Sequence, residues 1–333
     1  MWDSRNKDAY TVVGLCTRFD RMTAQWAAPG YAPFGLPPDS GDGFDEVTVR
    51  GALGSAVARH RRTSSSTRAT IFLHGAAGSW TTWIPLLRTA EEAGIRIDNP
   101  VLIDLPGWGS ASLTARADEV TIDAVCAIVK DSAEELGYTE WDIVGHSMGG
   151  FIALHMASIW PQSVMSVGII SGTGPSIIAS VRHPIRKFAV LPAFTMLWGG
   201  MRVLARLGPA GGAIIRALGR TRLLRAFVSP LFRFARRVDG TVVDALGREL
   251  RPLPFTLAAA LVGRYDIDRR WPRIECEVRA LNGDRDVFST RRDLQRLAEL
   301  VPHSVITVVR ECGHFAAIER PGEVLVALGY ALP

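Results

Sequence analysis

Lysine and paired cysteines are scarce in this 333-residue chain. Only three of its 38 basic residues are lysine, an arginine excess that genome base composition can produce without any role in function. Its four cysteines stand far apart and form no CxxC pair, which argues against a zinc site and against a disulfide framework. We therefore expect small buried thiols in a reducing compartment at Cys16, Cys126, Cys276 and Cys312.

Long hydrophobic runs are also missing. No stretch of about 18 uninterrupted apolar residues occurs, so the sequence predicts no transmembrane helix. The N-terminus has no basic segment followed by a long apolar stretch, and the apolar run 9–16 is too short for a signal peptide. These absences predict a cytoplasmic protein. Apolar residues make up 47% of the chain and charged residues 21%, which excludes global disorder.

Several motifs that carry metal or nucleotide chemistry do not occur. The sequence has no HExxH, no paired-carboxylate motif, no P-loop and no G-x-G-x-x-G after a strand. Gly107-Trp108-Gly109 falls in a different turn and does not indicate dinucleotide binding. We therefore expect no metal ion and no cofactor. Beyond charge, nothing resembles a nucleic-acid-binding module, so we expect no nucleic acid partner.

The order of the predicted elements indicates an α/β fold. Residues 1–27 have the apolar spacing of one amphipathic helix, and a Pro- and Gly-rich linker follows up to residue 43. Strands are predicted at 46–50 and 55–61, and helices at 122–136 and 148–159. Short, nearly continuous apolar runs lie at 70–73, 101–103, 142–144, 167–170, 278–281 and 305–309. Such runs are typical of a doubly wound, mostly parallel sheet covered by helices.

The alternation of strands and helices is interrupted once. Residues 175–262 contain no clear strand and are rich in Arg, Leu, Ala and aromatic residues, which predicts several short helices inserted between two strands. The chain therefore divides into an N-terminal helix and linker at 1–43, an α/β core at 44–174 and 263–333, and a helical insertion at 175–262.

The segment Gly145-His146-Ser147-Met148-Gly149-Gly150 carries the strongest chemical signal. It follows a predicted strand and opens a predicted helix, the setting in which G-x-S-x-G forms a sharp turn that exposes the serine hydroxyl. Small residues on both sides are needed because side chains there would collide or block the hydroxyl. Backbone N–H groups at the helix start lie beside it. Ser147 is therefore a candidate nucleophile.

A serine nucleophile needs a base and a group that orients the base. His314 follows the strand 305–309, and Asp284 and Asp286 follow the strand 278–281, so all three lie at the sheet edge that carries Ser147. The chain order is serine, aspartate, histidine, the order used on this kind of sheet. On position alone, either aspartate can serve.

Together these segments resemble the α/β-hydrolase superfamily, in its cap-bearing branch of esterases, haloperoxidase-like enzymes, carbon–carbon bond hydrolases and epoxide hydrolases. The resemblance covers about residues 44–333, and it is specific for the fold and only weakly specific for the substrate. Five segments carry it: 74–78, 104–109, 145–150, 283–286, and 313–314 with 319–321.

The resemblance implies a role for each site residue. Ser147 would be the nucleophile and His314 the general base. The family's acid usually stands three residues after the strand-end glycine, which selects Asp286 over Asp284. The oxyanion hole would use the backbone N–H groups of Met148 and Ala76, so the side chains at these two positions need not be polar.

Other motif residues are expected to be structural. His74 would anchor the oxyanion loop, and Asp104 would brace the turn before Pro106. The imidazole of His146 is expected to point away from the site. Glu319, five residues after His314, would be a structural partner near a helix start.

The identity of the nucleophile narrows the chemistry. Relatives that cleave halides or epoxides use Asp at the position of Ser147, so a serine there favours acyl-enzyme chemistry on a carboxylic ester or related acyl bond. The same residues would serve a carbon–carbon bond hydrolase, a thioesterase or a cofactor-free haloperoxidase-like enzyme. A ligand-binding protein on a hydrolase scaffold is the alternative of another class. The expected substrate is a small molecule with an apolar acyl group, and the sequence leaves the oligomeric state open.

The insertion is strongly basic. Residues 175–262 hold fourteen cationic and three acidic residues, a net charge of +11 in a chain of +5, which leaves −6 for the remainder. Three interpretations stay open: a cap with arginines on its outer face, a basic surface that makes weak peripheral contact with anionic lipid, and a pocket for an acidic substrate. The cap interpretation predicts that Leu191, Phe194 and Leu197 turn inward and that Arg202, Arg206 and Arg216 turn to water.

Overall fold

The computed structural model of the chain describes residues 30–36, 43–219 and 221–331. The helix expected at 1–27 and half of the linker after it lie outside these ranges, as does Cys16. Cys126 and Cys312 are buried free thiols and Cys276 is partly buried. None of the helices in the described ranges combines the length and the hydrophobicity that a bilayer span needs.

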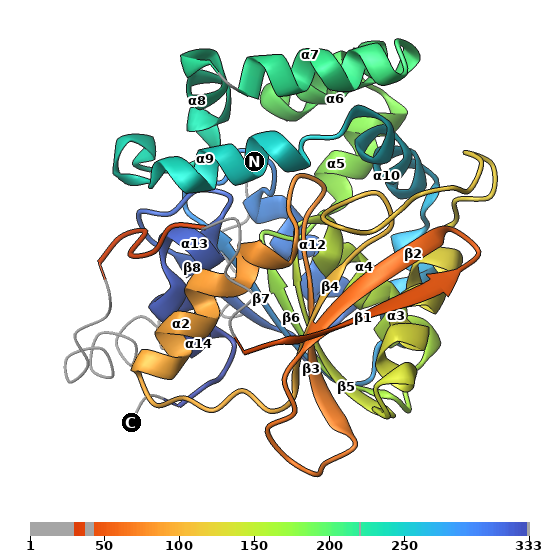
Figure 1. Cartoon of the computed structure of the whole chain (residues 1–333), viewed down its shortest axis with the longest axis vertical. Coiled ribbons are helices and arrows are strands. Elements are labelled where there is room, and N and C mark those ends of the chain that lie inside the picture. The colour runs from red at the N-terminus through yellow and green to blue at the C-terminus, as the bar shows by residue number, and fades with distance from the viewer. Residues whose placement is uncertain (1–29, 37–42, 220, 332–333) are drawn as a thin grey trace, which may run out of the picture.

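An eight-stranded sheet forms the centre of the molecule (Figure 1). Its spatial order is β1-β2-β4-β3-β5-β6-β7-β8; β1 pairs antiparallel with β2 and β2 with β4, and all other neighbours are parallel. The strands are β1 (Asp45–Gly51), β2 (Gly54–His60), β3 (Arg68–Leu73), β4 (Pro100–Asp104), β5 (Glu140–His146), β6 (Val164–Ile170), β7 (Glu277–Gly283) and β8 (Val305–Val309). The predicted doubly wound, mostly parallel sheet is confirmed.

Helices cover both faces of the sheet because its strands alternate their apolar side chains between two cores. Ile71 and Leu73 of β3 lie in one hydrophobic cluster, whereas Phe72 between them lies in the other. The first cluster includes side chains of α3 (Ile122–Glu135), α4 (Met148–Ile159) and α12 (Arg291–Leu300). The second includes side chains of α2 (Ile84–Glu92), α13 (Ala316–Glu319) and α14 (Pro321–Ala327).

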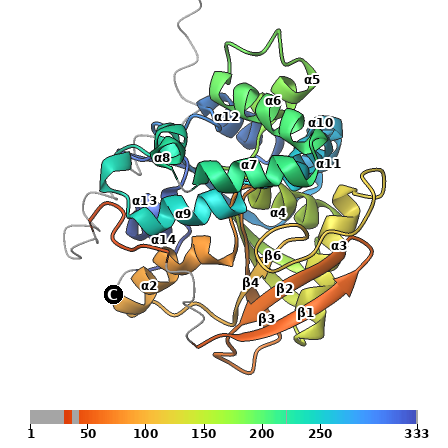
Figure 2. The ribbon, with the colours of Figure 1, turned by 45° about the horizontal axis from the view of Figure 1, so that its top comes forward.

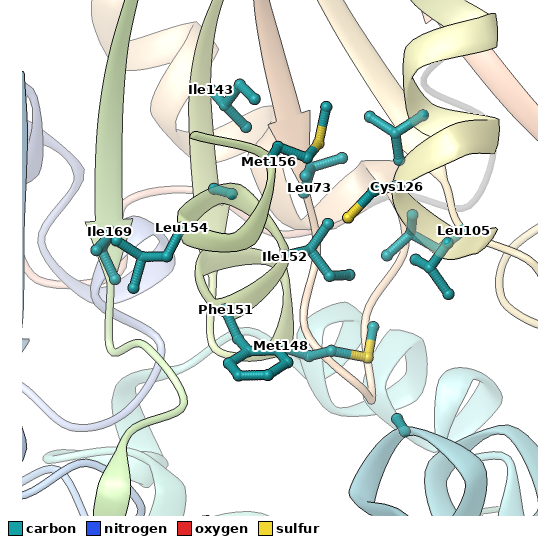
Figure 3. Packing of buried hydrophobic residues seen from close by; sticks show 14 of the residues in the cluster. Leu73, Leu105, Cys126, Ile143, Met148, Phe151, Ile152, Leu154, Met156 and Ile169 are labelled. Carbon is teal, nitrogen blue, oxygen red and sulfur yellow. The ribbon is translucent and has the colours of Figure 1, made fainter. Parts of the chain in front are cut away.

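The helix α4 is the most completely buried of the core helices that concern the site. Every residue from Met148 to Ser158 is buried. Figure 3 shows Phe151, Ile152 and Met156 of this helix among the side chains of neighbouring strands and of α3. A helix that is apolar on all sides is fixed by packing on all sides. Its N-terminus therefore holds a well-defined position at the end of β5.

The insertion between β6 and β7 is entirely helical. It comprises α5 (Pro175–Arg182), α6 (Pro192–Arg206), α7 (Pro209–Gly219), α8 (Arg222–Val228), the short turns 229–231 and 235–237, α9 (Gly240–Glu249) and α10 (Pro252–Arg264). The expected boundary at 262/263 falls within α10, and the short α11 (Ile267–Arg270) and the turn 271–273 precede β7. In Figures 1 and 2 these helices lie together at one end of the sheet.

The insertion has the two sides that its sequence predicts. Leu191, Phe194 and Leu197 are buried. The side chains that were expected to face water are exposed: Arg202, Arg206 and Arg216.

Candidate active site

Ser147 occupies the turn between β5 and α4 with a backbone that non-glycine residues seldom adopt. Its φ is 51° and its ψ is −113°. The turn is held by hydrogen bonds from the Ser147 N–H to the Ile170 carbonyl at 2.9 Å, and from the N–H groups of Gly150 and Thr173 to the Ser147 carbonyl, both at 3.1 Å. Such strain persists only where surrounding contacts impose it, and it is common at functional sites.

Glycine is required on both sides of this turn for different steric reasons. A Cβ on Gly145 would overlap the backbone of Gly149, and a Cβ on Gly149 would overlap the carbonyl of Leu73 in β3. The collision at Gly145 was expected from the sequence. The one at Gly149 is with the neighbouring strand and does not involve the Ser147 hydroxyl.

His314 lies in the loop after β8 and is paired with Asp286 in the loop after β7. Its Nδ1 lies 2.9 Å from Oδ1 and 3.1 Å from Oδ2 of Asp286. Both side chains are almost completely buried. Because a carboxylate only accepts hydrogen bonds, Nδ1 carries the proton and Nε2 is left as the basic nitrogen. The ring of Phe288 packs edge-on against that of His314, with centroids 4.9 Å apart.

Further hydrogen bonds keep Asp286 ionised. Its Oδ1 accepts from the N–H groups of Phe288 at 2.8 Å and Ser289 at 3.0 Å. Burial alone would raise the pKa of Asp286, but the charge and hydrogen bond of His314, with these two N–H groups, lower the pKa below its usual range. Asp284 instead accepts from the N–H of Cys312 at 3.1 Å and braces the loop that carries His314.

The expectation that His146 points away from the site is wrong. Its Nε2 donates to the carbonyl of His314 at 2.9 Å, and its ring centroid lies 4.9 Å from the rings of both His314 and Phe315. Burial lowers the pKa of His146 to about 3, so the ring is neutral. His146 directly precedes Ser147, so this hydrogen bond connects the His314 loop to the turn that carries Ser147. The local turn motif does not predict this tertiary contact.

Glu319 holds the other side of the same loop, as the sequence predicts for a structural partner. Its carboxylate accepts from the N–H groups of Gly313, Phe315 and Arg233 and from the hydroxyl of Tyr31, the last at 2.7 Å. It lies in the single turn of α13, two residues before α14 begins, which agrees with the predicted place near a helix start. Burial raises the pKa of Glu319 and of the Tyr31 phenol.

Ala76 and Met148 line the same cavity as Ser147 and have backbone amides without a partner among the described residues. In the ranges that the structure describes, neither N–H donates to another protein group. His74 anchors the loop of Ala76: its Nδ1–H donates to the Gly75 carbonyl at 2.7 Å, and its Nε2 accepts from the Leu105 N–H at 3.1 Å. Trp108 Nε1 also donates to the Ala76 carbonyl at 3.1 Å. This arrangement agrees with the anchoring role expected for His74.

Asp104 braces the segment after β4. It accepts from the N–H groups of Trp80 at 2.8 Å and Ser110 at 3.0 Å, and it is paired with Arg59 at 2.9 Å. The carboxylate fills the space beside Gly109, where a Cβ would overlap it.

The same segment is linked to the insertion by two residues that the sequence did not identify. Glu249 accepts from the N–H of Gly109 at 2.8 Å, and Arg251 donates to the carbonyls of Gly107 at 3.1 Å and Gly109 at 2.8 Å. Glu249 and Arg251 are themselves paired at 3.0 Å. No local sequence motif predicts these contacts, because they join positions about 140 residues apart.

A cavity of about 820 Å³, including its open mouth, lies between this site and the insertion. Ser147, His314, Ala76 and Met148 line its floor, and side chains of α5, α6, α8, α9 and α10 line its roof. Ser147 and His314 make no direct hydrogen bond, and such bonds often tighten only when substrate is present. The only polar side chains in the described lining are those of Ser147, His314, His146 and Thr173.

A second cavity of about 500 Å³ adjoins the first. Its lining is hydrophobic and comes from α3, α4, α10 and the loop after β4. Met148, Ala258 and Val262 line both cavities. The wall between the two spaces is therefore one side chain thick at these positions.

No group of three or more His, Cys, Asp or Glu side chains that could hold a metal ion occurs within the described ranges. The site offers instead a strained serine, a buried His–Asp pair, two free amides and an apolar cavity. This is the constellation of an α/β hydrolase.

Comparison with known proteins agrees with that class. The profile of the alpha/beta hydrolase family matches residues 70–328, and the chain belongs to this family. The chain is 31% identical to epoxide hydrolase 4 of Mus musculus over 120 residues, which are 35% of this chain and about a third (32%) of that protein's length.

Two further similarities cover more of the chain. It is 26% identical over 258 residues to 2-hydroxy-6-oxononadienedioate/2-hydroxy-6-oxononatrienedioate hydrolase 1 of Pseudomonas putida, with 75% of this chain and 82% of that one aligned. A solved esterase of Thermogutta terrifontis superposes with a TM-score of 0.62 at 18% identity, covering 85% of this chain and 96% of that one. At that identity the likeness concerns the fold.

Proposed function

We propose that the protein is a serine hydrolase that cleaves a carboxylic ester or a closely related acyl bond. The observation that carries the proposal is the joint arrangement around one cavity. Ser147 sits on a strained turn, the His314–Asp286 pair lies beside it, and the free amides of Ala76 and Met148 line the same space. Each component is known to contribute to acyl transfer.

In the proposed acylation step, Oγ of Ser147 attacks the substrate carbonyl while Nε2 of His314 takes the hydroxyl proton. The negative charge that develops on the carbonyl oxygen is stabilised by the amides of Ala76 and Met148. Asp286, kept ionised by its lowered pKa, stabilises the imidazolium. The intermediate then expels the alcohol, which leaves with the proton from His314.

In deacylation, His314 takes a proton from water, and the resulting nucleophile attacks the acyl group on Ser147. Collapse of the second tetrahedral intermediate releases the carboxylic acid and returns the proton from His314 to the Ser147 oxygen. Every bond formed and broken is thus accounted for without a cofactor.

The two adjoining cavities support an apolar acyl substrate. Neither lining contains a lysine or an arginine among the described residues, so the interpretation of an acidic-substrate pocket gains no support. The second, hydrophobic cavity lies behind Met148, whose amide is part of the proposed oxyanion hole. An acyl chain on Ser147 that displaced the side chains of Ala258 and Val262 could extend into it, which favours medium-length and long chains over acetate.

The relatives suggest two alternative reactions, the hydrolysis of a carbon–carbon bond and the hydrolysis of an epoxide. The name of the Pseudomonas putida relative denotes hydrolysis of a dicarboxylate, whereas the cavity here offers no basic side chain for a second carboxylate. The curated epoxide hydrolase aligns over only a third of its length, and a serine at position 147 favours an acyl-enzyme. A thioester or an ester is therefore preferred to a carbon–carbon bond or an epoxide as substrate.

Covalent labelling combined with substrate profiling tests the proposal. A fluorophosphonate probe should label the wild type, and Ser147→Ala should lose both labelling and turnover of p-nitrophenyl esters of graded chain length. Ser66→Ala, an exposed serine in the turn before β3, is the control and should retain both. Wild-type turnover by a folded Ser147→Ala protein would show that another residue is the nucleophile. No labelling and no turnover by the wild type would favour a binding protein.

A further inference from the structure

The insertion carries an unusual second apolar surface, on the side that faces away from the sheet. Twelve large hydrophobic residues are exposed in the described ranges, and eleven of them lie between residues 185 and 253. Val308 of β8 is the exception. Large exposed apolar patches on soluble domains usually mark a contact with another partner.

These side chains form stripes at helical spacing. In α6 and its end, Met196, Val203 and Leu207 are exposed, whereas Leu197 and Met201 are buried on the opposite side. In α7 the exposed pair is Ile214 and Leu218, four residues apart. In α8 the exposed pair is Leu223 and Phe227, next to the buried pair Leu224 and Val228. Each of these three successive helices thus has apolar residues that pack into the protein interior and further apolar residues that are exposed to solvent.

The charges around these stripes all have one sign. No Asp or Glu occurs anywhere between Asp142 and Asp239 in the sequence. In the part of the chain that the structure describes, Arg186, Arg206 and Arg216 form no ion pair, and Arg202 contacts only the ring of Trp198, at 4.9 Å. We call the exposed apolar residues of 185–227, with Arg186, Arg202, Arg206 and Arg216, the outer face.

We infer that the outer face docks on an anionic phospholipid bilayer. Apolar side chains flanked by long, unpaired cations are the pattern of helices that lie in the membrane interface. Each cation near an anionic surface adds attraction that salt screens. A second copy of the chain is a poor occupant, because a symmetric contact would bring the same uncompensated cations together.

The placement of the outer face gives docking a role in catalysis, a step that rests on the proposed function. Phe227 is 55% exposed on the outer face and also lines the cavity that holds Ser147. The cavity therefore opens beside the stripes, and Figures 1 and 2 show α6, α7 and α8 together at the outer end of the insertion. A substrate dissolved in the bilayer could enter without crossing water, which suits esters with long acyl chains.

Vesicle sedimentation tests the docking separately from catalysis. The full chain and its Ser147→Ala variant should both bind vesicles of phosphatidylcholine mixed with phosphatidylglycerol and should not bind phosphatidylcholine alone. Binding should weaken steeply as salt rises, since screening acts over about 10 Å at roughly 0.1 M. Equal binding to both vesicles, or none to either, would overturn the proposal whether or not the protein hydrolyses esters.

Matched variants distinguish docking through the outer face from a general effect of the protein's net charge. Arg202→Glu/Arg206→Glu should weaken binding at least about tenfold, while turnover of a soluble short-chain ester stays unchanged. Arg50→Glu/Arg273→Glu changes the net charge equally at exposed positions outside the insertion and should bind like the wild type. Equal losses in the two double variants would overturn the proposal.

The apolar stripes need their own pair of variants. Met196→Gln/Leu223→Gln removes two side chains that are 68% and 65% exposed, and it should weaken binding without altering short-chain turnover. Val308→Gln is the control. Gel filtration completes the test: if the wild type is a dimer that the Met196→Gln/Leu223→Gln change dissociates, and vesicles are not bound, the outer face belongs to a second copy.

Discussion

The sheet core and the insertion treat their charged and apolar side chains in opposite ways. In the core, buried carboxylates have partners: Asp104 is paired with Arg59 and Asp286 with His314, and Glu319 accepts hydrogen bonds. Val308 is the single exposed large hydrophobic residue of the core in the described ranges. In the insertion, Arg186, Arg206 and Arg216 form no ion pair within the described ranges, and eleven large hydrophobic residues are exposed. The core thus satisfies its buried charges internally, whereas the insertion exposes the cations and apolar side chains that we propose dock on a bilayer.

The largest expected effect is at the His–Asp pair, where the core should lose its chemistry. Asp286→Asn should lower kcat by up to about 10⁴-fold, because the amide cannot hold the proposed imidazolium. Asp284→Asn is the matched control, two residues away, and should cost far less, since the Asp284 carboxylate accepts from the Cys312 amide and makes no hydrogen bond to His314. Steady-state kinetics of both variants decide the assignment, and a larger loss at Asp284 would reverse it.

Substitution of one glycine in the core and one in the insertion tests whether the two regions differ in packing. Gly149→Ala places a methyl group on the Leu73 carbonyl, so we expect a loss of at least about 3 kcal/mol in the free energy of unfolding. Gly200→Ala, in α6, meets no atom within 4 Å and should stabilise the protein by about 0.5–1 kcal/mol. Chemical denaturation measures both. Similar effects at the two positions would contradict the contrast in packing.

A larger side chain on helix α10 of the insertion should fill the second cavity. Leu257→Trp on α10 should lower kcat/KM for long-chain p-nitrophenyl esters about tenfold or more while leaving acetate turnover nearly unchanged, because a misfit of this size costs about 1–3 kcal/mol. Leu253→Trp, on the same helix but 53% exposed, is the control. Equal losses on short and long esters would indicate that acyl chains do not enter this cavity.

A further expected effect concerns the pH dependence of stability at His146. The fold keeps this ring neutral, with its pKa lowered to about 3, while the unfolded chain takes up a proton near pH 6.5. The free energy of unfolding should therefore be full above about pH 6.5 and fall towards pH 3, with this residue contributing at most about 1.4 kcal/mol per pH unit. His146→Phe should show a shallower fall than the wild type between pH 7 and pH 5, and His183→Phe at an exposed site should not.

Much of the core could be predicted because its signals are local. The apolar runs identified the six parallel strands β3 to β8, and the predicted helix 148–159 matches α4. The turn at Ser147 could be recognised because the two glycines and the serine must be close in sequence. The position of each loop at the same sheet edge predicted that His314 lies near Asp284 and Asp286, and the resemblance to the α/β-hydrolase superfamily selected Asp286.

What could not be predicted depends on tertiary contacts. The contact of His146 with His314 joins positions 168 residues apart, and the Glu249 and Arg251 contacts span about 140. Composition revealed that the insertion is basic. Which side of α6, α7 and α8 faces inward depends on how the helices pack, because each carries apolar residues on both sides.

The contacts of Glu249 and Arg251 connect the insertion to the loop of Ala76 through the segment after β4. These two residues grip Gly107 and Gly109, and Trp108 between them holds the carbonyl of Ala76. We therefore expect a displacement of α9 or α10 to move Trp108, and with it the loop of Ala76, whose amide is proposed to stabilise the transition state. Removing the insertion should therefore loosen the loop that carries this amide, because the hydrogen bonds of Glu249 and Arg251 would be lost with it.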